Sequence, residues 1–229
     1  MRNVAVYVAD AGSVPSGNFG WARGDAADRE RVPHEGTDID GMVNAMVRDL
    51  RSGVGVALGF ECPLFLPVPA DAAALGKARA GECSKETGNK PFTGSAGACA
   101  AVTGVVELAW ILRRLHQEHP TRIGTLDWAA LAAGQASLFL WEAFISGKEK
   151  GATHVSDATL GVRAFLANLE SPMAANRVTA ESPFSLAGAL LLWSGLTSEI
   201  QCLHLPVPVL RPLPTVSTAE PSPSGPRLS

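Results

Sequence analysis

The chain has 229 residues, of which 46% are hydrophobic and 18% are charged, and its formal net charge at pH 7 is −3. This composition excludes a disordered chain and predicts a globular domain with a sizeable core. The pI of about 6.0 gives no overall basic character. The overall charge therefore does not predict non-specific nucleic-acid binding. This net charge is still compatible with a local basic groove.

The sequence contains four cysteines: Cys62, Cys83, Cys99 and Cys202. They form no C-x-x-C pair and no secretory signal precedes them, so we expect free thiols in a reducing compartment. The N-terminal apolar run is short and is interrupted by Asp10, unlike a signal peptide. The most apolar later stretch, residues 186–196, is too short to span a bilayer. We therefore expect a cytoplasmic protein without a membrane-spanning segment.

Residues 4–22 predict a β-hairpin. An apolar run ends on Asp10, a turn rich in Gly, Pro, Ser and Asn follows, and a second short run is Phe19-Gly20-Trp21-Ala22. A carboxylate at the end of a buried strand is costly unless it has a function there. The alternative is that Asp10 only caps the turn. A short third strand is predicted near residues 29–32.

The following segment predicts a helix and then a buried strand. Thr37-x-x-Asp40 is similar to a capping box, and Gly53 is placed to end the helix. Residues 54–66 form a near-continuous apolar run, typical of a strand buried on both faces, and carry Glu61 just before Cys62-Pro63. A helix between two strands predicts a crossover that makes the strands parallel. Each of these two strands finishes on a carboxylate.

The remaining elements are predicted from apolar periodicity and turn residues. In chain order they are a loop at 67–94, a long helix at 95–116, a short helix at 126–133, a buried strand at 137–144 that contains Glu142, a helix at 153–169 that contains Asp157, an apolar helix at 182–196 and a last strand at 207–210. Residues 212–229 are rich in Pro and Ser and predict a disordered tail.

This order of elements resembles the ribonuclease H-like fold, an α/β fold with a mixed five-stranded sheet in the order 3-2-1-4-5 and helices on both faces. The resemblance predicts a single domain over residues 1–211, with a core at 4–170 and a C-terminal helical addition at 171–211. More specifically, the chain is similar to a family of uncharacterised proteins that are predicted nucleases. The residues that carry this likeness are Asp10 with Gly20-Trp21-Ala22, Glu61-x-Pro63, Arg79-x-x-Glu82, Glu142 and Asp157-Ala158.

The resemblance implies a metal site. Enzymes of this superfamily hold Mg²⁺ with an Asp on the first strand, an acid at the end of the fourth strand and an Asp on the late helix. Asp10, Glu61 and Asp157 match these positions and are the expected ligands of Mg²⁺ or Mn²⁺, with Glu142 as an auxiliary catalytic residue. Many members have Asp where Glu61 stands. The implied activity is hydrolysis of a phosphodiester in nucleic acid by metal-activated water, without a covalent intermediate.

Simpler interpretations exist for each residue. Asp157 in the first turn of a helix stabilises the helix dipole without binding a metal. Glu142 on a buried strand fits a partner for Arg79, and His154 fits a solvated or capping residue. Arg79 and Lys77 are candidates for a phosphate contact, with a solvated loop as the alternative.

Two further residue types are expected to be structural. Cys62 lies beside Glu61, but thiolates are soft ligands and a poor match for Mg²⁺. The five tryptophans are expected in the core rather than as platforms for base stacking.

Two other functions remain open. The hairpin of residues 10–20 resembles the phosphate loop of sugar kinases and actin-like ATPases, and residues 93–97 at the entry of the long helix suit an anion, although the P-loop Lys-Ser/Thr signature is absent. These features favour a nucleotide- or phosphate-binding protein. The other alternative is a scaffold with a degenerate acid site. Four acids that lie more than about 8 Å apart in the structure would favour it.

Overall fold

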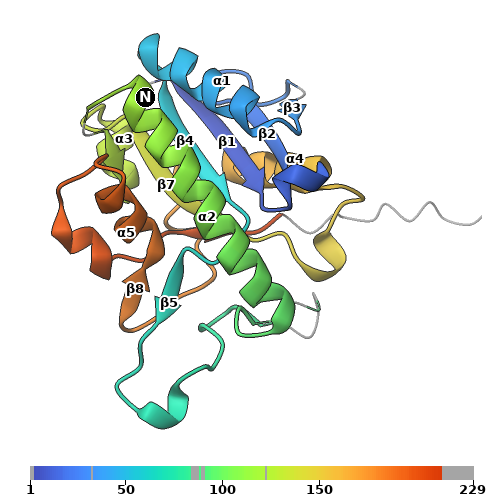
Figure 1. Ribbon diagram of the computed structural model, residues 1–229, viewed down its shortest axis with the longest axis vertical. Coiled ribbons are helices and arrows are strands. Elements are labelled where there is room, and N and C mark those ends of the chain that lie inside the picture. Colours follow the sequence, from blue (N-terminus) through green and yellow to red (C-terminus); the bar gives the residue numbers. More distant parts are fainter. Residues whose placement is uncertain (1–2, 32, 84–87, 89–90, 122, 213–229) are drawn as a thin grey trace, which may run out of the picture.

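The computed structural model describes residues 3–31, 33–83, 88, 91–121 and 123–212, and Figure 1 shows their arrangement. A mixed, mostly parallel sheet forms the centre. Within the described residues it has seven strands, in the order β3-β2-β1-β4-β7-β6, and β9 also pairs with β7. These strands are β1 (Val4–Asp10), β2 (Gly20–Asp25), β3 (His34–Gly36), β4 (Gly55–Phe60), β6 (Gly124–Thr125), β7 (Leu138–Ala143) and β9 (Val209–Leu210).

Helices cover both faces of the sheet, with α1, α2 and α5 on one face and α3 and α4 on the other (Figure 1). They are α1 (Ile39–Arg51), α2 (Ser95–Glu118), α3 (Trp128–Ala132), α4 (His154–Ala167) and α5 (Leu186–Trp193). Strand β1 is buried on both sides, because alternate side chains point to opposite faces. One core cluster contains Ala5, Tyr7 and Ala9, and the other contains Val4, Val6 and Val8.

The expected α/β class with a mixed sheet is confirmed, but the sheet is larger than the five strands predicted. The third strand lies at His34–Gly36 instead of 29–32. After β2 the chain turns: the Ala27 N–H donates to the Asp25 carboxylate at 2.9 Å, and Asp28 forms an isolated bridge with Asp25. Residue 32 of the predicted strand lies outside the described residues. The helix α1 is capped by Asp38, whose carboxylate accepts from the Asp40 and Gly41 amides, and not by Thr37.

Two predicted elements are each divided in the structure. The apolar run 54–66 gives β4 and then a separate strand, β5 (Phe65–Pro67), because the turn after Glu61 contains Pro63, which has no N–H for a ladder. The predicted helix 182–196 begins as β8 (Pro183–Ser185), which pairs antiparallel with β5 before α5 starts.

Helix α2 is the one described helix that is long and apolar enough to cross a membrane, and 28% of its most apolar window is buried. This criterion is weak, because core helices of soluble proteins also meet it. In this fold α2 packs on α1 and α5. The four cysteines are free thiols, as expected. The predicted tail at 212–229 lies outside the described residues except for Pro212.

Candidate metal centre

Three carboxylates from three elements meet at the carboxyl end of the central strands. Strands β1 and β4 are parallel neighbours in which Ala9 pairs with Phe60, and the Glu61 N–H donates to the Ala9 carbonyl at 2.8 Å. Asp10 and Glu61 therefore lie side by side where the strands end. Asp157, in the first turn of α4, completes the group, and one oxygen from each residue lies within 4.8 Å of the others. We call Asp10, Glu61 and Asp157 the acidic triad.

The position of Asp157 depends on how α4 begins. Thr153 and Ser156 form a reciprocal capping box that fixes the first turn. The start of α4 lies directly on β2 at Gly20, where an added Cβ would be 2.4 Å from the His154 carbonyl carbon and 2.5 Å from the Val155 nitrogen. A glycine at position 20 is thus required for α4 to bring Asp157 to the strand ends.

Gly20→Ala is expected to destabilise the protein by about 1–3 kcal/mol, the usual cost of overpacking, because both contacts are backbone atoms that have no rotamer to change. It is also expected to weaken Mn²⁺ binding by moving Asp157 away from Asp10. Urea denaturation and calorimetric titration measure the two effects. Gly41→Ala, whose Cβ would meet only the flexible end of the Asp38 side chain at 3.0 Å, is the control and is expected to change stability by no more than about 1 kcal/mol. Unchanged metal binding in Gly20→Ala would contradict this role for Gly20.

Burial sets the protonation of the triad. Asp10 and Asp157 are buried, and Glu61 is nearly so. Burial raises the pKa of Asp10 above its usual value. Burial, reinforced by the negative charge of Asp10, raises the pKa of Glu61 well above its usual value. Oε2 of Glu61 is also buried without a hydrogen-bond partner in the described chain. A cation bound among these carboxylates would favour their charged forms.

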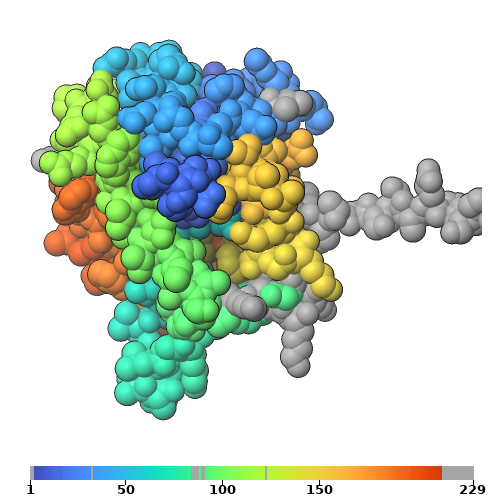
Figure 2. All heavy atoms as spheres, turned by 45° about the vertical axis from the view of Figure 1, so that its right-hand side comes forward, coloured from blue at the N-terminus to red at the C-terminus, as the bar shows by residue number. Residues whose placement is uncertain are grey.

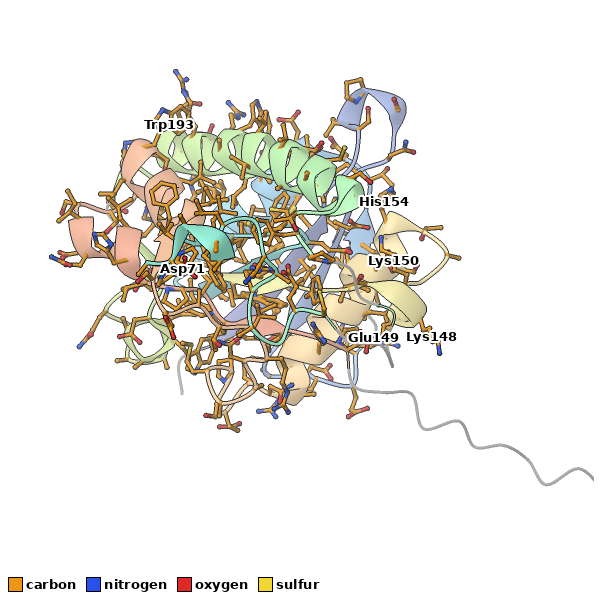
Figure 3. All side chains as sticks on the ribbon, turned by 90° about the horizontal axis from the view of Figure 1, so that it is seen from below. Asp71, Lys148, Glu149, Lys150, His154 and Trp193 are labelled. Atoms are coloured by element: carbon orange, nitrogen blue, oxygen red, sulfur yellow. The ribbon has the colours of Figure 1, made fainter. Side chains whose placement is uncertain are left out.

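Two basic side chains partly neutralise the triad. The Lys150 ammonium lies 3.3 Å from Asp157 Oδ2 and 3.6 Å from Glu61 Oε1, and His154 Nδ1 lies 2.7 Å from Asp10 Oδ2. Burial acts to lower the pKa of Lys150, but the three carboxylates raise it overall. Figure 3 shows Lys150 and His154 at the same end of the molecule. Lys150 was not a candidate from the sequence, where it follows only a charged loop.

The triad fits a hard divalent cation. Carboxylate oxygens are the preferred ligands of Mg²⁺ and Mn²⁺, and each residue of the triad offers one such oxygen within 4.8 Å of the others. The Lys150 ammonium can move away from the carboxylates to admit a cation, because its side chain is 48% exposed and extends from the loop after η3 (Gly147–Glu149). Cys62 is buried, and burial raises the pKa of its thiol well above the usual value. Cys62 is thus not disposed to act as a thiolate ligand.

Glu142 makes a different set of contacts. Its two carboxylate oxygens accept from Arg79 at 2.7 Å each, and Oε2 also accepts from the Leu64 N–H at 3.0 Å. Arg79 is fully buried and also binds Glu82 at 2.8 Å. The structure thus pairs Glu142 with Arg79 and does not bring it into the acidic triad, so its auxiliary catalytic role stays a prediction. Arg79 has no exposed surface with which to contact a phosphate.

A pocket of about 460 Å³ opens beside the triad. Glu61 and Lys150 line it, Ala96 and Gly97 contribute the first turn of α2, and Phe92 forms part of its wall. The N-cap of α2, Gly94, places no side-chain oxygen on this turn. The pocket therefore combines an acidic end with a helix N-terminus that suits an anion.

Comparisons with protein-family models, with curated proteins and with solved structures each gave no match to this chain.

Proposed function

We propose that this protein is a metal-dependent phosphodiester hydrolase, a nuclease, built on a ribonuclease H-like fold. The observation that carries the proposal is the acidic triad, in which oxygens from β1, the end of β4 and α4 approach one another within 4.8 Å. The order β3-β2-β1-β4-β7 supports the fold proposal, because it follows 3-2-1-4-5 once the short strands β5 and β6 are treated as insertions. Substrate identity is part of the proposal and rests on the resemblance.

The residues of the chain have separate tasks in this proposal. Asp10, Glu61 and Asp157 hold Mg²⁺ or Mn²⁺ through their carboxylate oxygens. A divalent cation bound there supplies a more acidic water and stabilises charge on the leaving oxygen of a phosphodiester. Lys150 turns from the carboxylates toward a phosphate oxygen of the substrate, a movement that its half-exposed side chain allows. His154 stays hydrogen-bonded to Asp10 and fixes the orientation of that carboxylate.

Asp10→Asn is expected to abolish binding of Mn²⁺ and Mg²⁺, because it removes a charged ligand from the centre of the triad. Isothermal titration calorimetry measures binding to the wild type and to the variant, with and without a mononucleotide, since Mg²⁺ sites take part of their ligands from phosphate. The control is Asp71→Asn, which changes an exposed carboxylate outside the triad (Figure 3). Equal binding by wild type and Asp10→Asn would contradict the metal site.

Hydrolysis is then measured on single- and double-stranded DNA and on RNA. We expect cleavage that depends on Mn²⁺ or Mg²⁺, that is lost in Asp10→Asn and that is kept in Asp71→Asn. Metal binding at the triad with no cleavage of any nucleic acid would contradict the hydrolase and leave the metal site intact.

A nucleotide- or phosphate-binding protein is the second candidate function. The pocket beside the triad favours it, because Glu61, Lys150 and the first turn of α2 line a volume suited to a mononucleotide. Metal-dependent binding of a mononucleotide without hydrolysis distinguishes this function from a nuclease. Separation of all four predicted acids would favour the scaffold alternative, whereas three of them lie close together and Glu142 is paired with Arg79.

A further inference from the structure

A second hollow lies on the other side of the turn that follows β1. It has a volume of about 680 Å³ and is formed by that turn, the start of α1 and the outer face of α2. Figure 2 shows the turn in dark blue, with α1 in lighter blue and α2 in green directly beside it. The walls are largely apolar and include Val14, Ile39, Val102, Val106 and Trp110. We call this hollow the α2 groove.

The apolar walls of the α2 groove are exposed to a degree that is unusual for such side chains. Val102 is 69% exposed and Val106 is 65% exposed, and Trp110, expected in the core, is 38% exposed. Valine and tryptophan on one helical face are normally buried, and an exposed apolar patch of this kind marks a binding surface. The Arg114 guanidinium lies over the Trp110 ring, 5.9 Å from its centroid, and a partly exposed aromatic ring suits stacking with a flat ligand.

The α2 groove also contains a buried acid with an unused hydrogen-bonding capacity. Glu107 lies on α2 between the exposed valines and Trp110, is only 8% exposed, and its Oε2 has no hydrogen-bond partner in the described part of the chain. A buried acceptor without a partner is costly and calls for a donor. Glu107 is also one of the residues that line the groove, so a donor bound there is the candidate partner for its carboxylate.

Glu107 and the acidic triad are close neighbours. Burial raises the pKa of Glu107 to about 7, the Gly12 backbone amide lowers it, and the charge of Asp10 raises it further. Gly12, two residues after Asp10, also lies against His154, since a Cβ at Gly12 would be 3.2 Å from that imidazole ring. Gly12 thus contacts Glu107 of the α2 groove on one side and lies near His154, the partner of Asp10, on the other.

We propose that the α2 groove binds a nucleobase that carries an exocyclic amino group, with its ring stacked on Trp110 and its amino group donating to Glu107. This inference rests on the proposed nuclease function, because the base would belong to the strand whose phosphodiester reaches the acidic triad. Carboxylates accept hydrogen bonds from amino groups of bases, and aromatic side chains stack on any base face. The groove would therefore select for adenine, cytosine or guanine beside the scissile bond.

The test uses nucleosides that lack phosphate, in the presence of a chelator, so that the metal site plays no part. Adenosine and purine riboside differ only in the exocyclic amino group and form a matched pair. We expect adenosine to quench tryptophan fluorescence saturably and to bind about tenfold more tightly than purine riboside, the factor that one net hydrogen bond of about 1.4 kcal/mol supplies. Equal affinities for the two nucleosides would overturn the role of Glu107.

Variants locate the site. Trp110→Ala is expected to reduce adenosine affinity at least about tenfold, and Glu107→Leu to remove the preference for adenosine over purine riboside, both followed by ligand-detected NMR. The control is Trp193→Ala, which changes a tryptophan that is 60% exposed on α5, at the end of the molecule opposite His154 (Figure 3). Adenosine binding that Trp110→Ala leaves unchanged would overturn the proposal.

Failure of the groove and failure of the nuclease proposal give different results. Asp10→Asn is expected to keep adenosine binding in chelator although it loses metal binding, and a protein that binds Mn²⁺ but no nucleoside would overturn the groove alone. A second copy of the chain is the competing occupant, and sedimentation velocity distinguishes it. A dimer that Val106→Asp dissociates, without any nucleoside binding, would assign the groove to self-association and overturn the proposal.

Discussion

Arg79→Met is expected to lower the free energy of unfolding by about 3–5 kcal/mol, the cost of leaving buried charges without a partner. Arg79 is fully buried, as are Glu82 and Glu142, and its guanidinium lies 2.8 Å from Glu82 and 2.7 Å from Glu142. Methionine has a similar length but no charge, so two buried carboxylates would face each other without a cation. Urea denaturation followed by circular dichroism measures the loss.

Two variants separate this explanation from a general effect of replacing arginine. Arg29→Met removes an equally short pair, 2.6 Å from Glu170, whose side chains are 42% and 69% exposed, and we expect a loss below about 1 kcal/mol. Adding Glu82→Gln and Glu142→Gln to Arg79→Met is expected to recover part of the stability, because the unpaired charges are then absent. A loss below about 1 kcal/mol in Arg79→Met itself would contradict a structural role for the cluster.

Glu61→Gln is expected to invert the stability order of variant and wild type when a metal is added. Because burial and the charge of Asp10 raise the pKa of Glu61 in the folded state, the neutral carboxyl stabilises the fold. That contribution is present below the unfolded-state pKa and is lost as pH rises through the folded-state pKa. In chelator the wild type should thus lose stability as pH rises from the unfolded-state pKa of Glu61 through its raised folded-state pKa, and above that range the neutral glutamine should be more stable by about 1 kcal/mol.

Saturating Mn²⁺ should reverse this order. A ligand at about 100 times its Kd stabilises the wild type by about 2.7 kcal/mol, and Glu61→Gln should gain much less because it has lost a charged ligand. Thermal unfolding in chelator and in Mn²⁺, each at two pH values, measures both effects. The same change at the exposed Glu118 is the control and should shift either value by no more than about 0.5 kcal/mol. A Glu61→Gln variant that is less stable than wild type in chelator would indicate that the triad has a structural role.

The fold was predictable where elements are long. Strand β1 and helix α1 carry clear apolar periods, and both lie close to their predicted positions. The strands β5, β6 and β8 have two or three residues each, which is too short for any period to appear, whereas the equally short β9 lies within the last strand predicted at 207–210. The pairing of these short strands depends on contacts between residues far apart in the chain, and β3 begins only after a local turn at Asp25.

The residues of the candidate site were predictable where they lie at the ends of long strands and helices. Asp10 and Glu61 end buried strands, so the predicted parallel crossover brought them together, and the resemblance to the ribonuclease H-like fold added Asp157. The pairing of Arg79 with Glu142 joins a loop to a central strand across 63 positions, and the sequence offered it only as one of two interpretations. Trp110 and Trp193 were expected in the core, and that expectation was wrong because each lies on the outer face of a surface helix.

The outer edge of β7 is shared by two short strands from different parts of the chain. Strand β6 pairs with Leu138 and Phe139, and β9 pairs with Glu142 and Ala143. On a ribosome that adds about 5–20 residues per second, β9 emerges several seconds after β7. The edge beside Glu142 stays open during that interval, and open edges favour association between nascent chains. The end of the sheet that holds the candidate site is therefore enclosed only after Val209 and Leu210 have been synthesised.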